Sequence, residues 1–170
     1  MEVSIALQQR RSVRSYEEKL VEEQKLVKVL EAGRLSPSVT NRQEWKFLVV
    51  KSDEKRKKLA EAACGQSFIS EAPVILVACA TETRAIMPCG LPAHIVDVSI
   101  AFAYMILQAW DLGLGTCWIG AFQEEEVKRI LSIPEDIRVV AMSPLGYPTH
   151  GIPPRPRKSL AEIVCFEEYS

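Results

Sequence analysis

Apolar residues nearly surround one long stretch of the chain, Ile95 to Leu112, in which Asp97, Ser99, Gln108 and Asp111 are the exceptions. A helix that is apolar on all faces must be buried on most sides. Its length would suffice to cross a bilayer, but the polar positions and the lack of basic flanks argue against a membrane span. We therefore expect this helix to lie at the centre of a soluble protein.

Glycines follow this helix closely. Gly113 stands where a helix commonly ends in a left-handed residue. The residues from Thr116 to Ile119 predict a short strand that Gly120 ends. The dinucleotide fingerprint G-x-G-x-x-G is excluded, because it would need glycine at Trp118 and a strand rather than a helix before it. The pattern predicts instead a strand end where the backbone can approach a flat ligand.

The rest of the pattern alternates between helices and strands within a single domain, residues 1–170. A continuous apolar run, Pro73 to Ala80, predicts a central strand covered on both faces. Amphipathic or capped segments predict the helices Val3–Gln9, Glu18–Leu35, Asp53 to about Cys64 and Gln123–Leu131. β-rich runs predict the strands Trp45–Val50 and Arg138–Leu145, and turn residues predict loops at 36–43, 65–69 and 81–92. By itself this alternation suggests a parallel α/β sheet.

Composition changes this picture little. The chain of 170 residues is 48% hydrophobic and 25% charged, with a net charge of −1, which is typical of one globular domain and gives no global attraction to nucleic acid. The amino-terminal residues do not resemble a signal peptide, so we expect a cytoplasmic protein. The five cysteines contain no C-x-x-C pair and the two histidines are isolated, so no metal site is expected.

Local charge is more informative than net charge. One basic cluster is Arg10-Arg11-Ser12-Val13-Arg14-Ser15-Tyr16, and a second, Arg155-Pro156-Arg157-Lys158, lies in a proline-rich extended stretch. Guanidinium groups match the geometry of phosphate oxygens. Both clusters could be solvated surface charges, but one dianionic phosphate gripped by both is the more economical interpretation. Nucleic acid is disfavoured because no aromatic residues are interleaved with the charges.

Two further segments have features that composition does not explain. The loop at 36–43 is rich in small side chains that offer both donors and acceptors, which suits either a simple connection or the edge of a heterocycle. The last segment, Ser159 to Phe166, is too short to bury its own apolar side chains. We expect it to pack on another element or on another subunit.

Four motifs, in this order, resemble the FMN-dependent nitroreductase family over nearly the whole chain. They are Arg10 to Tyr16, Pro37-Ser38-x-x-Asn41-x-Gln43-x-Trp45, Gly113 to Gly120, and Gly146-Tyr147-Pro148 leading to Arg157-Lys158. The resemblance implies a short, single-domain member with an α+β fold, in which helices wrap a mostly antiparallel central sheet. It also implies a homodimer with FMN bound at the subunit interface, and it overrides the parallel sheet suggested by the alternation.

The resemblance also implies which residues bind the cofactor. The FMN phosphate would be held by Arg10, Arg11, Ser12, Arg157 and Lys158. Arg14 would lie near flavin N1 and O2, where a cation stabilises the reduced ring. The partner subunit would contribute Pro37, Ser38 and Val39, with Asn41 and Gln43 as polar contacts. Gln66 would reach the pyrimidine edge, and the backbone of Trp118, Ile119 and Gly120 would lie near N5. No side chain is implied as an acid, base or nucleophile.

The implied activity is an NAD(P)H oxidoreductase that reduces nitroaromatic, quinone or similar small acceptors by ping-pong hydride transfer through flavin N5. Two alternatives stay open: a flavin-binding or flavin-handling protein without nicotinamide turnover, and a specialised relative that dehalogenates substrates or fragments flavin. The sequence departs from the family at Glu44, where proline is common, and in the short stretch 80–94, which carries Arg84, Cys89 and His94. The acceptor and the preferred nicotinamide therefore stay open.

Overall fold

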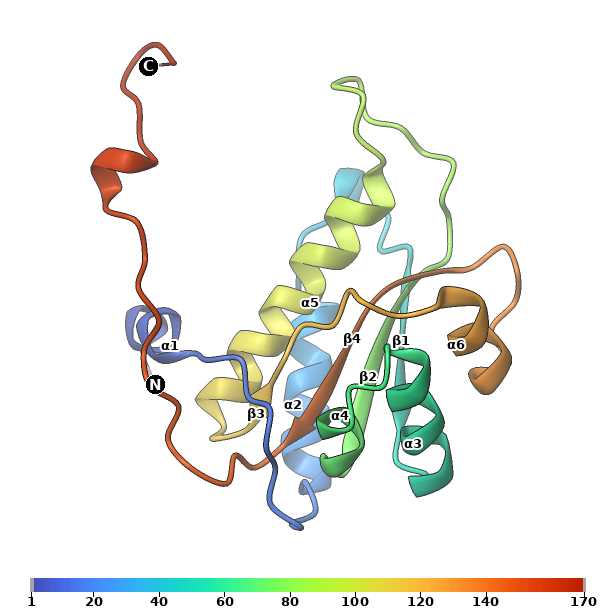
Figure 1. The fold of residues 1–170 in the computed structure, drawn as a ribbon. Helices are drawn as coiled ribbons and strands as arrows, with labels where there is room; N and C mark the ends of the chain where they lie inside the picture. Colours follow the sequence, from blue (N-terminus) through green and yellow to red (C-terminus); the bar gives the residue numbers. More distant parts are fainter. Residues whose placement is uncertain (1, 170) are drawn as a thin grey trace.

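One antiparallel sheet of four strands forms the centre of the molecule, as seen in a computed structural model that describes residues 2–169 (Figure 1). The strands are β1 (Trp45–Val50), β2 (Val74–Ala80), β3 (Gly115–Thr116) and β4 (Arg138–Gly146), in the order β1-β2-β4-β3. All three neighbouring pairs are antiparallel. The expected α+β fold is confirmed, and the parallel sheet suggested by the alternation alone is wrong.

Helices cover both faces of this sheet (Figure 1). They are α2 (Glu23–Arg34), α3 (Asp53–Ala62), α4 (Phe68–Glu71), α5 (Ala93–Asp111) and α6 (Glu124–Leu131), whereas α1 (Val3–Gln9) contacts α5 and lies away from the sheet. Strand β2 is buried at every residue, as predicted. Its odd-numbered residues pack with α3 and α6, and its even-numbered residues pack with α2 and α5. The alternation of side chains along a strand thus divides the core into two layers.

Helix α5 runs along one face of the sheet and buries Phe102 and Met105 completely. By length and composition alone it could cross a membrane, and 44% of that span is buried inside the fold. The sequence predicted that this helix is buried on most sides, and a single chain does not bury it to that extent. Its residues Ile95 and Tyr104 are 42% and 45% exposed. At the end of the helix Gly113 takes φ +76°, which confirms the predicted left-handed residue.

The structure differs from the predicted elements at three places. Helix α2 begins at Glu23 rather than Glu18. The residues before it run past the end of β4, where the Glu17 N–H donates to the carbonyl of Tyr147 (2.9 Å). The predicted turn at 65–69 leads into the short helix α4, which buries Ile69. Strand β3 is only two residues long, because the Cys117 N–H donates to the Ser143 hydroxyl instead of a backbone carbonyl (3.1 Å).

The carboxyl-terminal arm, residues 149–169, leaves the end of β4 and stands away from the body of the molecule (Figure 1). Residues 151–158 are without regular structure, as their prolines predicted, and a 3-10 turn follows at Leu160–Glu162. Beyond Ile152 every described residue of the arm is exposed, including Leu160 at 76% and Phe166 at 86%. The arm therefore has apolar side chains that its own chain does not cover.

Candidate functional site

The first basic cluster is fixed along strand β3. The Val13 N–H donates to the Thr116 carbonyl (2.8 Å), and Ser12 and Thr116 form a parallel bridge. A Cβ on Gly115 would come within 2.5 Å of the Val13 side chain, so this close approach requires glycine. Two of the resembling motifs, distant in sequence, therefore lie side by side.

Tyr16 joins this segment to the start of the carboxyl-terminal arm. Its hydroxyl donates to the Val13 carbonyl (2.8 Å), and its backbone forms a bridge with Pro148. The Thr149 N–H then donates to the Ser15 carbonyl (3.3 Å). Burial raises the pKa of Tyr16 far above its ordinary value, so the phenol stays protonated and keeps donating. This anchor directs the arm back towards the arginines.

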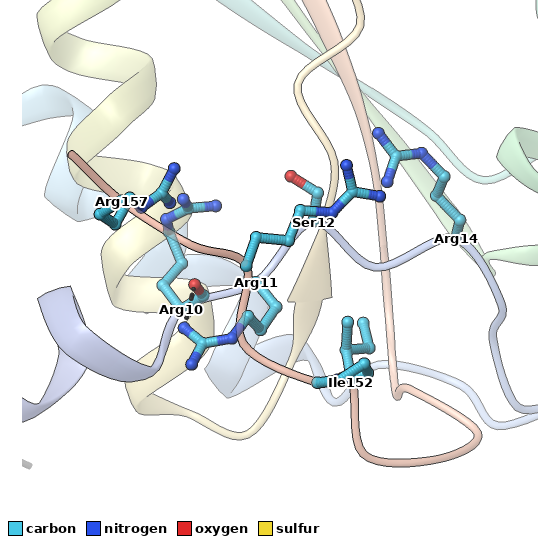
Figure 2. Close-up of a pocket in the computed structure, with 8 residues that line it drawn as sticks. Arg10, Arg11, Ser12, Arg14, Ile152 and Arg157 are labelled. Atoms are coloured by element: carbon cyan, nitrogen blue, oxygen red, sulfur yellow. Dashed lines mark hydrogen bonds between the residues drawn. The ribbon is translucent and has the colours of Figure 1, made fainter.

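A cavity of about 210 Å³ lies between the amino-terminal segment and the arm (Figure 2). Its lining shows five guanidinium groups and no carboxylate: Arg10, Arg11, Ser12, Arg14, Ile152, Pro153, Arg155 and Arg157. Across residues 2–169 none of these five arginines forms an ion pair with Asp or Glu. Like charges held this close repel one another, so the cavity suits an anion with several acceptor oxygens.

Arg11 shows most directly that the cavity is incomplete without a ligand. Its Nη1 donates to the carbonyls of Gln8 (2.6 Å) and Arg10 (3.0 Å), which fixes the guanidinium at the end of α1. Its Nε is buried without any hydrogen-bond partner in the described part of the chain. A buried donor of this kind is costly unless an acceptor reaches it. A phosphate oxygen would supply that acceptor.

Sequence reasoning did not assign Arg155 to the site, although it placed the residue in the second basic cluster. Arg155 and Arg157 are two residues apart in an extended segment, so both face the cavity. Lys158, which was expected to join Arg157, does not line the cavity. The period-two spacing of the arginines was the signal that could have identified Arg155.

The segment Trp118 to Gly120 continues from β3 towards the body of the molecule. The Ile119 N–H donates to the Met142 carbonyl (2.8 Å) and is therefore already engaged, whereas the Gly120 N–H finds no acceptor within residues 2–169. Trp118 is 41% exposed and meets Phe102 edge to face at 5.2 Å. Of the three expected residues, Ile119 is thus the one whose N–H is engaged within the chain, while the N–H groups of Trp118 and Gly120 form no hydrogen bond among residues 2–169.

Two other side chains meet this segment. The Gln66 amide donates to the Ala63 carbonyl (2.9 Å) and to the Ala121 carbonyl (3.5 Å), so Gln66 lies beside the end of the segment. Burial raises the pKa of the Cys117 thiol, and the neighbouring Arg14 opposes this rise only in part. Cys117 therefore stays a neutral thiol beneath the arginines.

The loop with the remaining expected residues lies away from the arginine cavity of the same chain. Pro37, Ser38, Val39, Asn41 and Gln43 surround a short 3-10 turn at Val39–Asn41, next to the start of α5. Strand β3 follows the far end of that helix. At 1.5 Å per residue, the Val39 contact at Asp97 lies roughly 20 Å from the end of α5. One chain thus brings the two basic clusters and β3 together, but not this loop.

Comparisons with known proteins agree with this geometry. The model of the nitroreductase family matches residues 7–71 and 62–147. An FMN reductase [NAD(P)H] of Bacillus subtilis is 32% identical over 185 residues, covering 99% of this chain and 74% of its own. An NADH dehydrogenase of Thermus thermophilus is 30% identical over 197 residues, covering 98% of this chain and 96% of its own.

Solved structures give the same result. A nitroreductase family protein of Clostridium novyi superposes with a TM-score of 0.84 at 33% identity, over 88% of this chain and 86% of that one. The family model covers the first basic cluster and all four strands of the antiparallel sheet. The chain belongs to the nitroreductase family.

Proposed function

We propose that this protein is an FMN-dependent NAD(P)H oxidoreductase. The observation that carries the proposal is the cavity in which five guanidinium groups converge with no carboxylate among its lining residues. The names of similar proteins, an FMN reductase [NAD(P)H] and an NADH dehydrogenase, support the same chemistry. Residues 1–170 would act as one FMN-binding domain.

The residues of the cavity fit the phosphate end of FMN. Arg10, Arg11 and Ser12 from the amino-terminal segment, with Arg155 and Arg157 from the arm, would bind its oxygens. Each charge-assisted hydrogen bond of this kind contributes about 1.5–3 kcal/mol. Arg11 Nε, which is buried without a partner, would gain an acceptor. Lys158, outside the cavity lining, would add long-range attraction only.

The neighbouring segments fit the ring of the flavin. Arg14 would lie at the N1 and O2 edge, where its charge favours the reduced ring. The Gly120 N–H, which has no acceptor among the described residues, would donate towards N5, and Trp118 and Ile119 would shape the backbone beside it. Gln66 would remain close to the pyrimidine edge through its contact with Ala121. These side chains bind and orient, and none is needed as an acid or base.

The site would be completed by a second copy of the chain. The loop at 37–43 lies too far from the cavity of its own chain, so we place Pro37, Ser38, Val39, Asn41 and Gln43 against the flavin of the partner subunit. A hollow of about 540 Å³ between α1, α2 and α5 exposes apolar side chains, among them Leu7, Tyr104 and Leu107. Together with the apolar arm it offers the surface that a stable homodimer requires.

When bound, FMN would supply hydride-transfer chemistry between NADH or NADPH and a small acceptor such as a nitroaromatic compound or a quinone. The protein would exclude water from the ring and expose one side of it, so donor and acceptor would use the same place in turn. Ping-pong kinetics follow from this arrangement. We expect the enzyme to act in the cytoplasm without nucleic-acid partners.

The test is the absorbance spectrum of the purified protein with FMN, recorded anaerobically before and after NADH or NADPH is added. We expect a bound flavin spectrum that bleaches with at least one nicotinamide and recovers when a quinone is added. A protein that binds no FMN would contradict the cofactor assignment. Bound flavin that dithionite bleaches but neither nicotinamide does would favour the flavin-handling alternative.

A further inference from the structure

We propose that Asp97 is a positioning residue that holds the loop 38–43 in the conformation in which this loop meets the flavin. The inference rests on the proposed function, because the contact between this loop and a flavin is part of that proposal. Asp97 was noted in the sequence only as a polar interruption of an apolar helix. In the structure it is 5% exposed and is one of the few buried charged residues.

The loop has a conformation that its sequence does not favour. Thr40, Asn41 and Gln43 have φ values of 50°, 58° and 55°, so three of four consecutive residues are left-handed without being glycine. Asn tolerates this region, but Thr and Gln disfavour it, Thr most of all, because Cβ crowds the following carbonyl. Backbone strain of this kind persists only where surrounding contacts hold it, and it concentrates at ligand-binding sites.

Hydrogen bonds within the loop 38–43 hold its carboxyl-terminal end, at Gln43. The Gln43 N–H donates to the Ser38 hydroxyl (3.0 Å), and the Gln43 side-chain amide donates to the Asn41 carbonyl (3.2 Å). These bonds would let the loop move as one unit. They close the loop on itself without fixing it to the rest of the molecule.

The tie to the body of the molecule is made by Asp97. Its Oδ1 accepts the N–H of Val39 at 3.0 Å, and Val39 is one of the residues proposed to lie against the partner's flavin. Asp97 lies on α5 directly before the buried Val98 and one turn before Ala101, so its own backbone is fixed by the core. A rigid helix thereby sets the position of a strained loop.

The surroundings of Asp97 show that a carboxylate is more than packing at this point. Burying a charge is expensive unless it is paired or hydrogen-bonded, and an apolar side chain would fit the neighbouring core without that cost. Among residues 2–169, the charged and titratable groups that interact with it are Arg42, which pairs with Glu44 at 2.8 Å, and His94, one turn earlier on α5. The retained acceptor is therefore best explained by what it holds, the Val39 N–H.

The test compares Asp97→Ala, which removes the acceptor, with Asp97→Asn, which removes the charge and keeps an acceptor oxygen. Val98→Ala is the matched control, because it weakens the core of the same helix without touching the loop. Three quantities are measured on the full-length protein: hydrogen exchange of the loop peptide without FMN, visible circular dichroism of bound FMN, and the anaerobic rate of flavin reduction by the active nicotinamide.

We expect Asp97→Ala to speed exchange of the loop, to change the flavin dichroism and to slow reduction by roughly 10- to 100-fold, as a displacement near 1 Å can do. Asp97→Asn should restore all three towards wild type, and Val98→Ala should lower the melting temperature alone. The inference is overturned if Asp97→Ala shifts only the melting temperature, or if Asp97→Asn is as impaired as Asp97→Ala.

A second variant tests the same contact from the loop side. Val39→Pro removes the donor, and it suits the first residue of a helical turn that follows an extended residue, Ser38. We expect Asp97→Ala to add nothing to the rate defect of Val39→Pro, because both remove one hydrogen bond. Additive defects would overturn the inference. If wild-type protein binds no FMN, the proposed function fails first, and that result is distinct from all of these.

Discussion

At the scale of single residues, the candidate site depends on five guanidinium groups that reach one cavity from two distant parts of the sequence. Arg10, Arg11 and Arg14 are fixed through the pairing of their segment with β3, and Arg155 and Arg157 through the extended arm. The sequence placed the first three and Arg157 in two basic clusters, the family resemblance implied that they bind FMN, and the structure brings all four to one cavity. Residue type and spacing could not say which residue of the second cluster faces inward, since that depends on the course of the arm.

Arg155 gives the sharpest prediction at this scale. Arg155→Ala should raise the Kd for FMN by roughly 10- to 100-fold, because it removes a charge-assisted hydrogen bond to the phosphate. Fluorescence titration of FMN measures the change. Lys57→Ala, which removes one positive charge from an exposed ion pair on α3, is the control. Equal affinities for the two variants would show that Arg155 does not contact the phosphate.

At the scale of elements, a cluster around Tyr147 joins three of them. Lys25 on α2 donates to the Tyr147 hydroxyl (2.8 Å) and to the carbonyl of Leu112 after α5 (2.9 Å). The Tyr147 hydroxyl in turn donates to the Glu22 carboxylate (2.6 Å), and the Lys19 ammonium lies 3.8 Å from the centre of its ring. The entry to α2 and the ends of α5 and β4 are thereby fixed to one another.

Removing the Tyr147 hydroxyl should make the melting temperature depend less on pH. The hydrogen bond from Tyr147 lowers the pKa of Glu22 from its ordinary value of 4.5, so its contribution is present above that value and is lost as pH falls through the folded-state pKa. Tyr147→Phe should therefore melt below wild type at about pH 7, with the gap narrowing as the pH falls below 4.5, while the part due to the lost bond from Lys25 remains. Thermal denaturation across this range measures it.

The control for this series is Tyr169→Phe, since Tyr169 is fully exposed. Its melting temperature should follow wild type at every pH. A gap between Tyr147→Phe and wild type that stays constant with pH would mean that the hydroxyl stabilises the fold without acting through Glu22.

This cluster also explains where prediction from sequence failed at the element scale. Periodicity located β1, β2, β4, α1 and α6 closely, because each buries a face whose pattern is local. The start of α2 was placed five residues early, since Leu20 and Val21 continue a helical pattern that contacts with Tyr147 interrupt. Strand pairing is set by contacts far apart in sequence, so only the family resemblance gave the antiparallel order.

At the scale of the whole molecule, apolar surface gathers on one face of α5 and on the arm. Monomeric proteins rarely expose contiguous patches of this kind. The apolar pattern of this helix predicted burial on most sides, and the structure of one chain buries only 44% of the helix span. In the proposed homodimer, the second copy of the chain would cover this surface.

Leu107→Lys should separate the subunits, because it places a charge in the hollow between α1 and α5. We expect sedimentation to change from dimer to monomer and bound FMN to be lost with it, since the loop at 37–43 would no longer reach the flavin. Leu20→Lys, at a residue 81% exposed before α2, is the control and should stay a yellow dimer. A Leu107→Lys monomer that keeps its flavin would exclude a shared site.

The contact between β3 and the first basic cluster has a consequence for the order of folding. The proposed phosphate site would form only once Gly115 pairs with Gly146 and Val13 packs against Gly115, and Val13 and Gly115 are more than a hundred residues apart in the sequence. Contacts of such separation form late and slowly. Capture of the cofactor would then mark the end of folding, and quenching of flavin fluorescence during refolding would trail the recovery of helix.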